Sequence, residues 1–243
     1  DKQVAIDRQN FEISPKLPKE SHRYAAKLQL AYEDFCAKYQ YDGFSANFNV
    51  YREDGRIDQL PILGASNMLA KGYGYSAEGD VHILLCTLIG HIISKDPHFT
   101  EMYSLDFKRD ATMLSHMGEG NWKIARKDRP IKLIDRELDI GDRSNPPTPI
   151  FSGEPGEATL ISLVAVEGEK YRLVVSVGEV LDTDELPDMV MNFTFFRPYT
   201  GVKQAMSDWL RYGGTHHQVL FLGDVSRKFE RLCEILEIEY VLV

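Results

Sequence analysis

Four side chains of this sequence could together bind a divalent cation. They are Glu78, Glu101, His116 and one of the neighbouring pair His216 and His217, and each stands at the edge of a predicted element beside a glycine or an aromatic residue. A site with two carboxylates and two imidazoles suits Mn²⁺, with Co²⁺ and Mg²⁺ as alternatives. The separations are too long for a local metal motif, so the site requires a fold that brings these residues together.

Glu78 lies in a glycine-rich stretch, residues 72–80, directly before a strongly apolar run. The glycines admit backbone angles closed to other residues and can hold the carboxylate on a tight bend that faces a cleft. The alternative is an ordinary helix start, in which Glu78 and Asp80 complement the helix dipole. Both interpretations predict a buried helix at residues 81–93.

Glu101 and His116 also have ordinary structural interpretations. Glu101 could be an exposed strand residue, but Phe99 and Tyr103 lie on the same face of the predicted strand, where an unpaired carboxylate is costly. His116 stands in an apolar segment that is followed by glycines. It could end a strand and project into a cleft, or it could be a hydrogen-bonded core histidine.

His216 and His217 follow Gly213 and Gly214 and precede a predicted strand at residues 217–222. The two glycines permit close approach of the backbone to another group. In a strand-like conformation the two rings would point to opposite faces, so at most one of them would bind a given ion.

Composition limits the classes of partner. The chain has 243 residues and a formal net charge of −9, which argues against a nucleic-acid or anionic-membrane surface, because either needs clustered Lys and Arg. No stretch is long and apolar enough for a membrane span. Cys36, Cys86 and Cys233 lie in apolar contexts and predict buried, reduced thiols in a cytoplasmic protein. The first residue is Asp1, so we expect a fragment of a longer chain.

The first part of the chain predicts an α/β arrangement. Residues 1–18 are polar, contain two prolines and predict an irregular lead-in. Apolar residues recur at helical spacing in residues 20–39, alternation predicts a half-buried strand at 44–51, and a helix is expected at 60–70. Together with the helix at 81–93, these elements indicate an α/β layer.

The second part of the chain is mostly β in character. A strong hairpin signal covers residues 158–181, where two runs of Val, Leu and Ile flank Glu-Gly-Glu-Lys. Asp96-Pro97 breaks the preceding helix, and we expect a domain boundary directly before it. The chain therefore divides into an α/β part, residues 1–94, and a β-rich, barrel-like part with covering helices, residues 95–243.

Four motifs resemble those of L-arabinose isomerases and occur in the same order. They read Gly-Tyr-Gly-Tyr-Ser-Ala-Glu-Gly-Asp at 72–80, Phe-Thr-Glu-Met-Tyr-Ser-Leu-Asp-Phe at 99–107, Ser-His-Met at 115–117 and Gly-Gly-Thr-His-His at 213–217. The resemblance covers about residues 20–243. It implies that residues 1–94 are the C-terminal portion of the family's middle domain and that residues 95–243 are the domain that completes the metal site. It also implies that an N-terminal domain is missing.

In that family the Mn-binding set is two glutamates and two histidines. The matching positions here are Glu78, Glu101, His116 and His217, the second of the histidine pair. The resemblance implies that the two glutamates are also the acid/base pair of an aldose–ketose isomerase, an intramolecular oxidoreductase that converts L-arabinose to L-ribulose through an enediolate. The expected cofactor is Mn²⁺, with Co²⁺ or Mg²⁺ as alternatives, and no organic cofactor is expected.

The resemblance also implies partners and further contacts. We expect a small-molecule sugar substrate, no nucleic acid and no membrane, and a homo-oligomer, either a trimer or a hexamer, whose active site is shared between subunits. The family's substrate-stacking aromatic residue would be Phe48 or Tyr51, and Phe99 and His216 are further expected sugar contacts.

One segment departs from the family. Arabinose isomerases continue after Ser-His-Met with Leu-Glu and a Cys-Pro, whereas this chain has Gly118-Glu119-Gly120-Asn121-Trp122. The difference leaves open a related isomerase that acts on another sugar. A separate alternative is a catalytically silent carbohydrate-binding or assembly module, in which the four ligands would be vestigial. Intact ligand types at all four positions favour an isomerase, because a silent module has no need for costly charged groups in a cleft.

Overall fold

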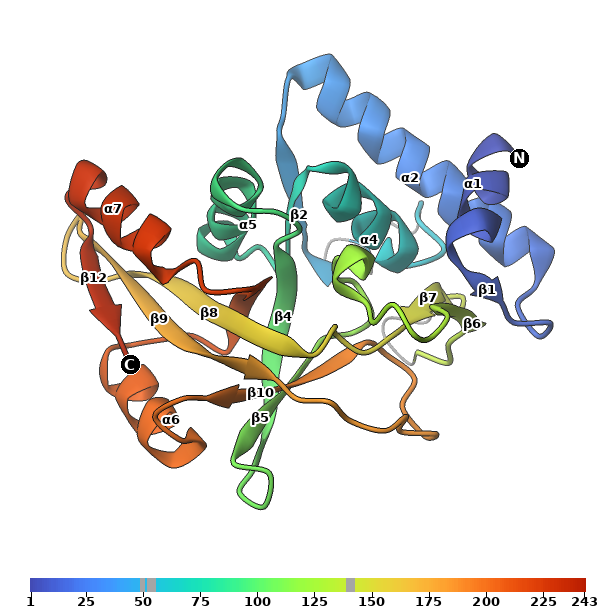
Figure 1. The fold of residues 1–243 in the computed structure, drawn as a ribbon. Helices are drawn as coiled ribbons and strands as arrows, with labels where there is room; N and C mark the ends of the chain where they lie inside the picture. The colour runs from blue at the N-terminus through green and yellow to red at the C-terminus, as the bar shows by residue number, and fades with distance from the viewer. Residues whose placement is uncertain (49–50, 52–55, 139–142) are drawn as a thin grey trace.

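The computed structural model describes residues 1–48, 51, 56–138 and 143–243 (Figure 1). In the first part of the chain, helices alternate with short strands. Its elements are α1 (Lys2–Asn10), β1 (Glu12–Ile13), α2 (Lys19–Tyr39), β2 (Gly43–Ala46), α4 (Ile62–Lys71), β3 (Gly74–Ala77) and α5 (Val81–Ile93). The strands β2 and β3 form a parallel pair, as is usual in an α/β layer.

The second part of the chain consists mainly of strands. Its elements are β4 (His98–Asp106), β5 (Ala111–Ser115), η1 (Trp122–Ile124), β6 (Lys132–Asp135), β7 (Pro147–Ile150), β8 (Gly156–Ala165), β9 (Tyr171–Val180), β10 (Phe193–Pro198), α6 (Val202–Arg211), β11 (His217–Leu222), α7 (Ser226–Leu236) and β12 (Glu239–Leu242). The predicted α/β fold class, the long helices of the first part and the hairpin at residues 158–181 are confirmed.

The strands of the second part close into an antiparallel barrel. Among the described residues, the ring has six strands in the order β10–β5–β4–β11–β8–β9, and β9 pairs with β10 to close it. The β8–β9 hairpin pairs over its whole length, from Gly156 opposite Val180 to Ala165 opposite Tyr171. Closure leaves no free edge in the ring and fixes each strand against two neighbours.

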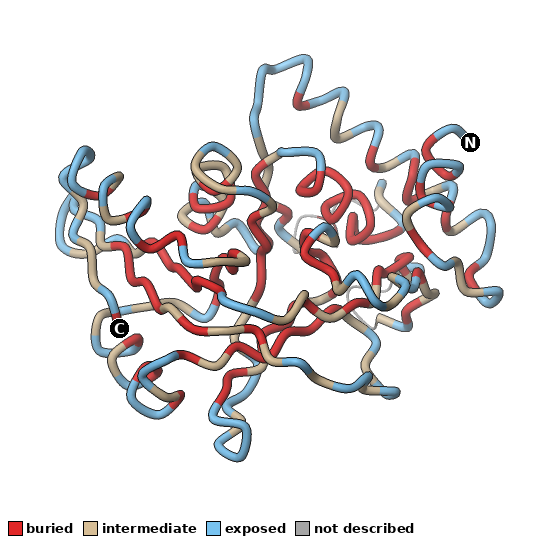
Figure 2. Tube along the Cα trace, in the orientation of Figure 1, coloured by how far each residue is buried: buried red, intermediate tan, exposed pale blue. Residues whose placement is uncertain are grey.

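One hydrophobic core joins the first part of the chain to the barrel. It includes Leu69 of α4, Tyr75 of β3, Ile83 of α5, Phe99 of β4 and Phe221 of β11. Residues 62–70 of α4 are all buried, whereas α2 exposes one side to solvent (Figure 2). Helix α5 packs so closely on β11 that a Cβ at Gly90 would lie 2.7 Å from the Phe221 ring. Helix α4 is therefore a core helix. Helix α5 buries only one side, because Val81, Leu85 and Ile92 are exposed, so the predicted helix at 81–93 is present but is not buried all round.

The opening of the chain is ordered, so the predicted irregular lead-in at residues 1–18 is wrong. Helix α1 is held by a buried polar network. Asp7 accepts hydrogen bonds from Gln3 (2.9 Å) and Asn67 (3.0 Å), and it pairs with His22 (2.8 Å). Hydrophobic periodicity does not reveal such a helix, because the contacts that fix it are polar.

The strand predicted at residues 44–51 is shorter in the structure. Strand β2 ends at Ala46, and Phe48 and Tyr51 have helical geometry, while residues 49–50 lie outside the described part of the chain. The partner strand β3 turns away directly after Ala77, so β2 has no neighbour to pair with beyond Ala46. The alternating pattern thus continues past the point where the ladder can form.

The three cysteines are buried free thiols, as the sequence predicts. Burial raises the pKa of Cys86 to about 12, which keeps this thiol protonated. In the part of the chain that the structure describes, no helix has the length and apolar character needed to cross a membrane.

Gly178 allows the barrel to close, and its substitution tests that closure. Gly178 lies opposite Pro198, and a Cβ there would overlap the backbone of Arg197 and Pro198. Backbone atoms cannot move aside without opening the β9–β10 pair, so we expect Gly178→Ala to lower the free energy of unfolding by about 1–3 kcal/mol in urea denaturation. The control Glu179→Ala removes only a partly exposed ion pair with Arg197 and should cost about 0–1 kcal/mol. Equal losses in the two variants would contradict this account of closure.

Candidate metal centre

Glu78 sits in the turn between β3 and α5. Its φ of 61° lies in the left-handed region, and Gly79 follows with a φ of 84°. The turn is fixed to the end of β2, because the Glu78 N–H donates to the Ala46 carbonyl oxygen (2.6 Å) and the Gly79 N–H donates to Ser45 Oγ (2.9 Å). The Glu78 side chain, which is 45% exposed, therefore leaves β3 in a defined direction.

Strand register brings Glu101, His116 and His217 to the same place. On the antiparallel pair β4–β11, Glu101 lies directly opposite His217. On the pair β4–β5, Glu101 lies opposite Ser115, and His116 follows at the end of β5. Because directly opposite residues project from the same face of a sheet, Glu101 and His217 converge. His116 lies one residue beyond the end of β5, outside the alternation of that strand, and its ring also reaches this place.

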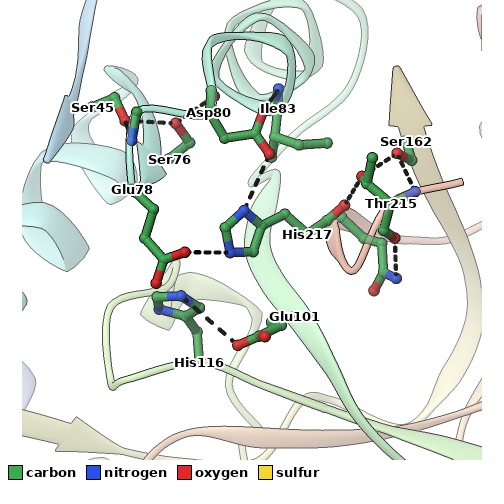
Figure 3. A network of polar contacts seen from close by, with 12 residues as sticks. Ser45, Ser76, Glu78, Asp80, Ile83, Glu101, His116, Ser162, Thr215 and His217 are labelled. Carbon is green, nitrogen blue, oxygen red and sulfur yellow. Dashed lines mark hydrogen bonds and ion pairs between the residues drawn. The ribbon is translucent and has the colours of Figure 1, made fainter. Parts of the chain in front are cut away.

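The four predicted ligands face one another (Figure 3). His116 Nε2 lies 3.9 Å from Glu101 Oε2, and His217 Nε2 lies 3.8 Å from Glu78 Oε2. The centroids of the two imidazole rings are 5.4 Å apart. Ligand atoms of Glu101, His116 and His217 all lie within 4.8 Å of one another, and Glu78 joins this group through His217.

His216 forms a second group with Glu78 and His217, whose ligand atoms also lie within 4.8 Å of one another. The ring centroids of His216 and His217 are 4.3 Å apart, with 35° between the ring planes, so the prediction that the rings point to opposite faces is wrong. Strand β11 begins at His217, and His216 therefore lies outside the alternation of the strand. His216 is exposed beside the exposed Glu78, where it can reach a ligand.

The other predicted sugar contacts lie in or against the core. Phe99 is fully buried and packs edge-on against His116 (4.8 Å between centroids) and His217 (5.3 Å). Tyr51 is part of the hydrophobic core, and the partly buried Phe48 packs against it. Phe99 thus supports the two imidazoles from the core side, and sugar contacts by Phe99, Tyr51 and Phe48 stay predictions.

Asp80 connects helix α5 to His217. Its Oδ1 accepts the Ile83 N–H (3.1 Å) and caps the N-terminus of α5, and its Oδ2 lies 3.1 Å from His217 Nδ1. Burial works to raise the pKa of Asp80, but the hydrogen bonds from His217 and from the Ile83 N–H outweigh burial and lower the pKa. The carboxylate is therefore ionised and held by two partners.

Glu119 forms an ion pair with His116, although the orientation of the two groups is not that of a hydrogen bond. Its Oε2 lies 3.0 Å from His116 Nδ1, and its Oε1 accepts a hydrogen bond from the Tyr75 hydroxyl (2.9 Å). Burial works to raise the pKa of Glu119, but the adjacent imidazole and the Tyr75 donor lower it overall. Burial works to lower the pKa of His116, but Glu119, Glu101 and Glu78 raise it overall. The fully buried carboxylate is thus paired with a neighbouring imidazole.

The arrangement fits a divalent cation. In each of the two histidines a carboxylate lies at Nδ1, so Nε2 is the nitrogen that faces a glutamate. The Nε2–carboxylate distances of 3.9 Å and 3.8 Å are too long for hydrogen bonds. His217 Nε2 is buried and has no hydrogen-bond partner within the described residues. A cation between these atoms would satisfy both groups, and imidazoles backed by carboxylates are typical of histidine ligands.

Sequence reasoning missed the contacts that Asp80, Glu119 and Tyr75 make in this site. The sequence does identify Asp80 as a helix-start residue, and the N-cap contact confirms it. Nothing in the spacing indicates that the second oxygen of Asp80 meets a histidine of β11. Glu119 follows His116 by three residues, but the segment between them is irregular, so no periodicity predicts the contact.

The fold and the site define a mixed α/β protein with a candidate metal centre at the ends of barrel strands. The family model of the L-arabinose isomerase central domain matches residues 1–96, and that of the L-arabinose isomerase C-terminal domain matches residues 96–239. The chain therefore belongs to the L-arabinose isomerase family. The predicted division at residues 94 and 95 stays a prediction, since the two parts share one core.

Curated L-arabinose isomerases are similar to this chain. That of Nocardioides sp. (strain ATCC BAA-499 / JS614) is 32% identical over 232 residues, which cover 92% of this chain and 45% of the relative. That of Acidothermus cellulolyticus is 26% identical over 258 residues, which cover 100% of this chain and 50% of the relative. That of Clostridium beijerinckii is 29% identical over 212 residues, with coverages of 85% and 42%. The chain spans about half the length of the curated relatives it matches.

Ser45 anchors the turn that carries Glu78. Its hydroxyl oxygen accepts the Gly79 N–H and a hydrogen bond from the Ser76 hydroxyl (3.1 Å). We expect Ser45→Ala to speed amide hydrogen exchange at residues 78–80 and to cost about 0.5–1.5 kcal/mol of stability. Hydrogen exchange followed by mass spectrometry measures the effect.

The matched control is Ser207→Ala, which removes an exposed hydroxyl hydrogen bond to the Lys203 carbonyl oxygen on α6. It should leave exchange at residues 78–80 unchanged. If Ser45→Ala also leaves that exchange unchanged, Ser45 does not hold the turn.

Proposed function

We propose that this chain carries the metal-binding part of an aldose–ketose isomerase that converts L-arabinose to L-ribulose. The observation that supports the proposal most is the convergence of four side chains. Glu101 and His217 meet through the register of β4 and β11, His116 at the end of β5 lies beside Glu101, and Glu78 faces His217. Membership of the L-arabinose isomerase family supports the choice of reaction, which is the isomerisation of an aldose at a site with these metal-binding side chains.

The proposed cation is Mn²⁺, with Co²⁺ or Mg²⁺ as alternatives, because carboxylate oxygens and imidazole nitrogens form the donor set. Glu78, Glu101, His116 and His217 would hold it. When bound, the cation supplies Lewis-acid stabilisation of the negative charge that develops on the sugar oxygens. No organic cofactor enters the proposed reaction.

The two glutamates are the proposed acid/base pair. One carboxylate takes the proton from C2 of the open-chain aldose to give an enediolate, and the pair returns a proton to C1. The proton of the C2 hydroxyl moves to the oxygen on C1, so the product is the ketose. The side chains of Glu78 and Glu101 are 45% and 25% exposed, so a sugar can reach them. The ligands His116 and His217 are buried and stay fixed.

Further proposals concern the whole protein. We propose that a sugar contacts His216 and either Phe48 or Tyr51 near Glu78. The family resemblance supports a homo-oligomer, a trimer or a hexamer, in which subunits share the active site. The free, buried thiols support a cytoplasmic location.

The segment after His116 favours a second candidate, an isomerase of this family that acts on another aldose. Gly118 has a φ of 122°, and a Cβ there would overlap the side chain of the buried Thr148. The Leu that arabinose isomerases carry at this place could not enter without displacing Thr148. The backbone of the loop after His116 would therefore differ from that of arabinose isomerases. This difference would change the shape of the site that receives the sugar.

Metal binding tests the proposed site in the full-length protein. We expect Mn²⁺ to raise the Tm of the wild type, because a ligand that binds only the folded state stabilises it. His217→Ala and Glu101→Ala should lose that shift. The controls His91→Ala and Glu185→Ala change the same residue types outside the site, and both variants should keep the rise in Tm that Mn²⁺ causes. A wild type whose Tm does not respond to Mn²⁺ would refute the metal site.

A screen of aldopentoses with the Mn²⁺-loaded protein tests the substrate. We expect turnover of L-arabinose and a loss of about 10²–10⁴-fold in Glu101→Gln, because the amide cannot accept the proton. Turnover of a different aldose would select the second candidate. Bound Mn²⁺ without turnover of any aldose would favour a silent carbohydrate-binding module.

A further inference from the structure

We infer that Asp80 and Glu119 are positioning residues that turn the Nε2 atoms of His217 and His116 toward the cation site, and that Tyr75 holds Glu119 in place. The inference rests on the proposed function, because it assigns residues around the same site. The two carboxylates meet the histidines at Nδ1, the ring nitrogen that does not face Glu78 or Glu101 in these pairs.

Asp80 removes the rotational freedom of the His217 ring. Its Oδ2 lies 3.1 Å from His217 Nδ1, and its Oδ1 accepts the Ile83 N–H. The carboxylate cannot rotate away without breaking the cap of α5. An ionised carboxylate only accepts hydrogen bonds, so Nδ1 carries the proton and Nε2 keeps its lone pair free for a cation.

Glu119 lies between His116 and Tyr75, and it forms an ion pair with the imidazole that does not have the geometry of a hydrogen bond. Oε2 lies at His116 Nδ1, and Oε1 accepts the Tyr75 hydroxyl. Tyr75 is itself immobile, because it is fully buried and its ring stands edge-on to Phe99 (5.5 Å) and Phe44 (5.2 Å). A buried carboxylate is costly unless it is paired, and the pair found here orients a candidate ligand.

One short segment therefore acts on both histidines. Tyr75 and Asp80 lie on β3 and in the turn that follows it, on either side of Glu78. Tyr75 holds the partner of His116, and Asp80 holds His217 directly. Residues 75–80 thus supply one ligand and orient two others that come from the barrel.

Conservative substitutions test the inference in the full-length protein. Asp80→Asn removes the charge at His217 Nδ1 but keeps the cap of α5, because Asn and Asp are equally good N-caps. Glu119→Gln removes the charge at His116 Nδ1, and Tyr75→Phe removes only the donor to Glu119. We expect Mn²⁺ affinity, measured by titration calorimetry, to fall about 10–100-fold in Asp80→Asn and Glu119→Gln and by less in Tyr75→Phe.

The controls are Asp182→Asn and Glu185→Gln, which make the same chemical changes at exposed ion pairs and should keep the wild-type affinity. Pulsed electron paramagnetic resonance of bound Mn²⁺ provides a second readout, because it detects coupling to imidazole nitrogen. We expect each carboxylate variant to weaken the coupling from one imidazole. A merely structural role would lower the Tm of the metal-free protein and leave the coupling unchanged.

The outcomes separate this inference from the proposed function. Wild-type affinity and unchanged nitrogen coupling in Asp80→Asn and Glu119→Gln would overturn the inference. A wild type that does not bind Mn²⁺ would instead overturn the proposed function. If Glu119→Gln does not fold, the Mn²⁺ affinity and nitrogen coupling of Asp80→Asn test the inference, because that variant retains the cap of α5.

Discussion

The candidate metal centre depends on the register of three barrel strands. Glu101 is paired with His217 on one side and with Ser115 on the other. A slip of one residue between β4 and β11 would turn Glu101 or His217 to the opposite face of the sheet, and a slip between β4 and β5 would move the end of β5 that carries His116. Closure between β9 and β10 opposes such a slip, because each strand of the ring is held by two neighbours. The ring as a whole, rather than any local motif, therefore places the barrel ligands.

The remaining ligand comes from outside the barrel. Glu78 is placed by a turn that is hydrogen-bonded to β2 and by helix α5, which Asp80 caps and which packs on β11. Asp80 contacts both α5 and His217. The packing of this helix against the barrel therefore also fixes the orientation of the His217 imidazole. Neither part of the chain holds all four candidate ligands alone.

Local sequence patterns predict the helices of the first part and the barrel hairpin because runs of apolar residues, ended by glycines, prolines or charged turns, mark the segments that are buried. The helix at 81–93 and the strand at 217–222 agree with the structure. Helix α1 was not predictable in this way, because Asp7 fixes it through buried polar contacts. Four candidate ligands could be named from residue types and a family resemblance. The contacts of Asp80 with His217 and of Glu119 with His116 could not be predicted, because they depend on the tertiary fold and follow no periodic spacing in the sequence.

The pairing of distant strands also bears on how the protein would acquire its ion. β1 pairs with β6, and β4 pairs with β11, so the chain folds through contacts of long sequence separation, which form slowly. The ligands meet only when the barrel is assembled, unlike those of zinc fingers, whose metal drives folding. A nascent chain therefore has no centre with which to capture a cation during synthesis. The proposed cation would therefore be selected only by the folded protein, from the ions that surround it at that time.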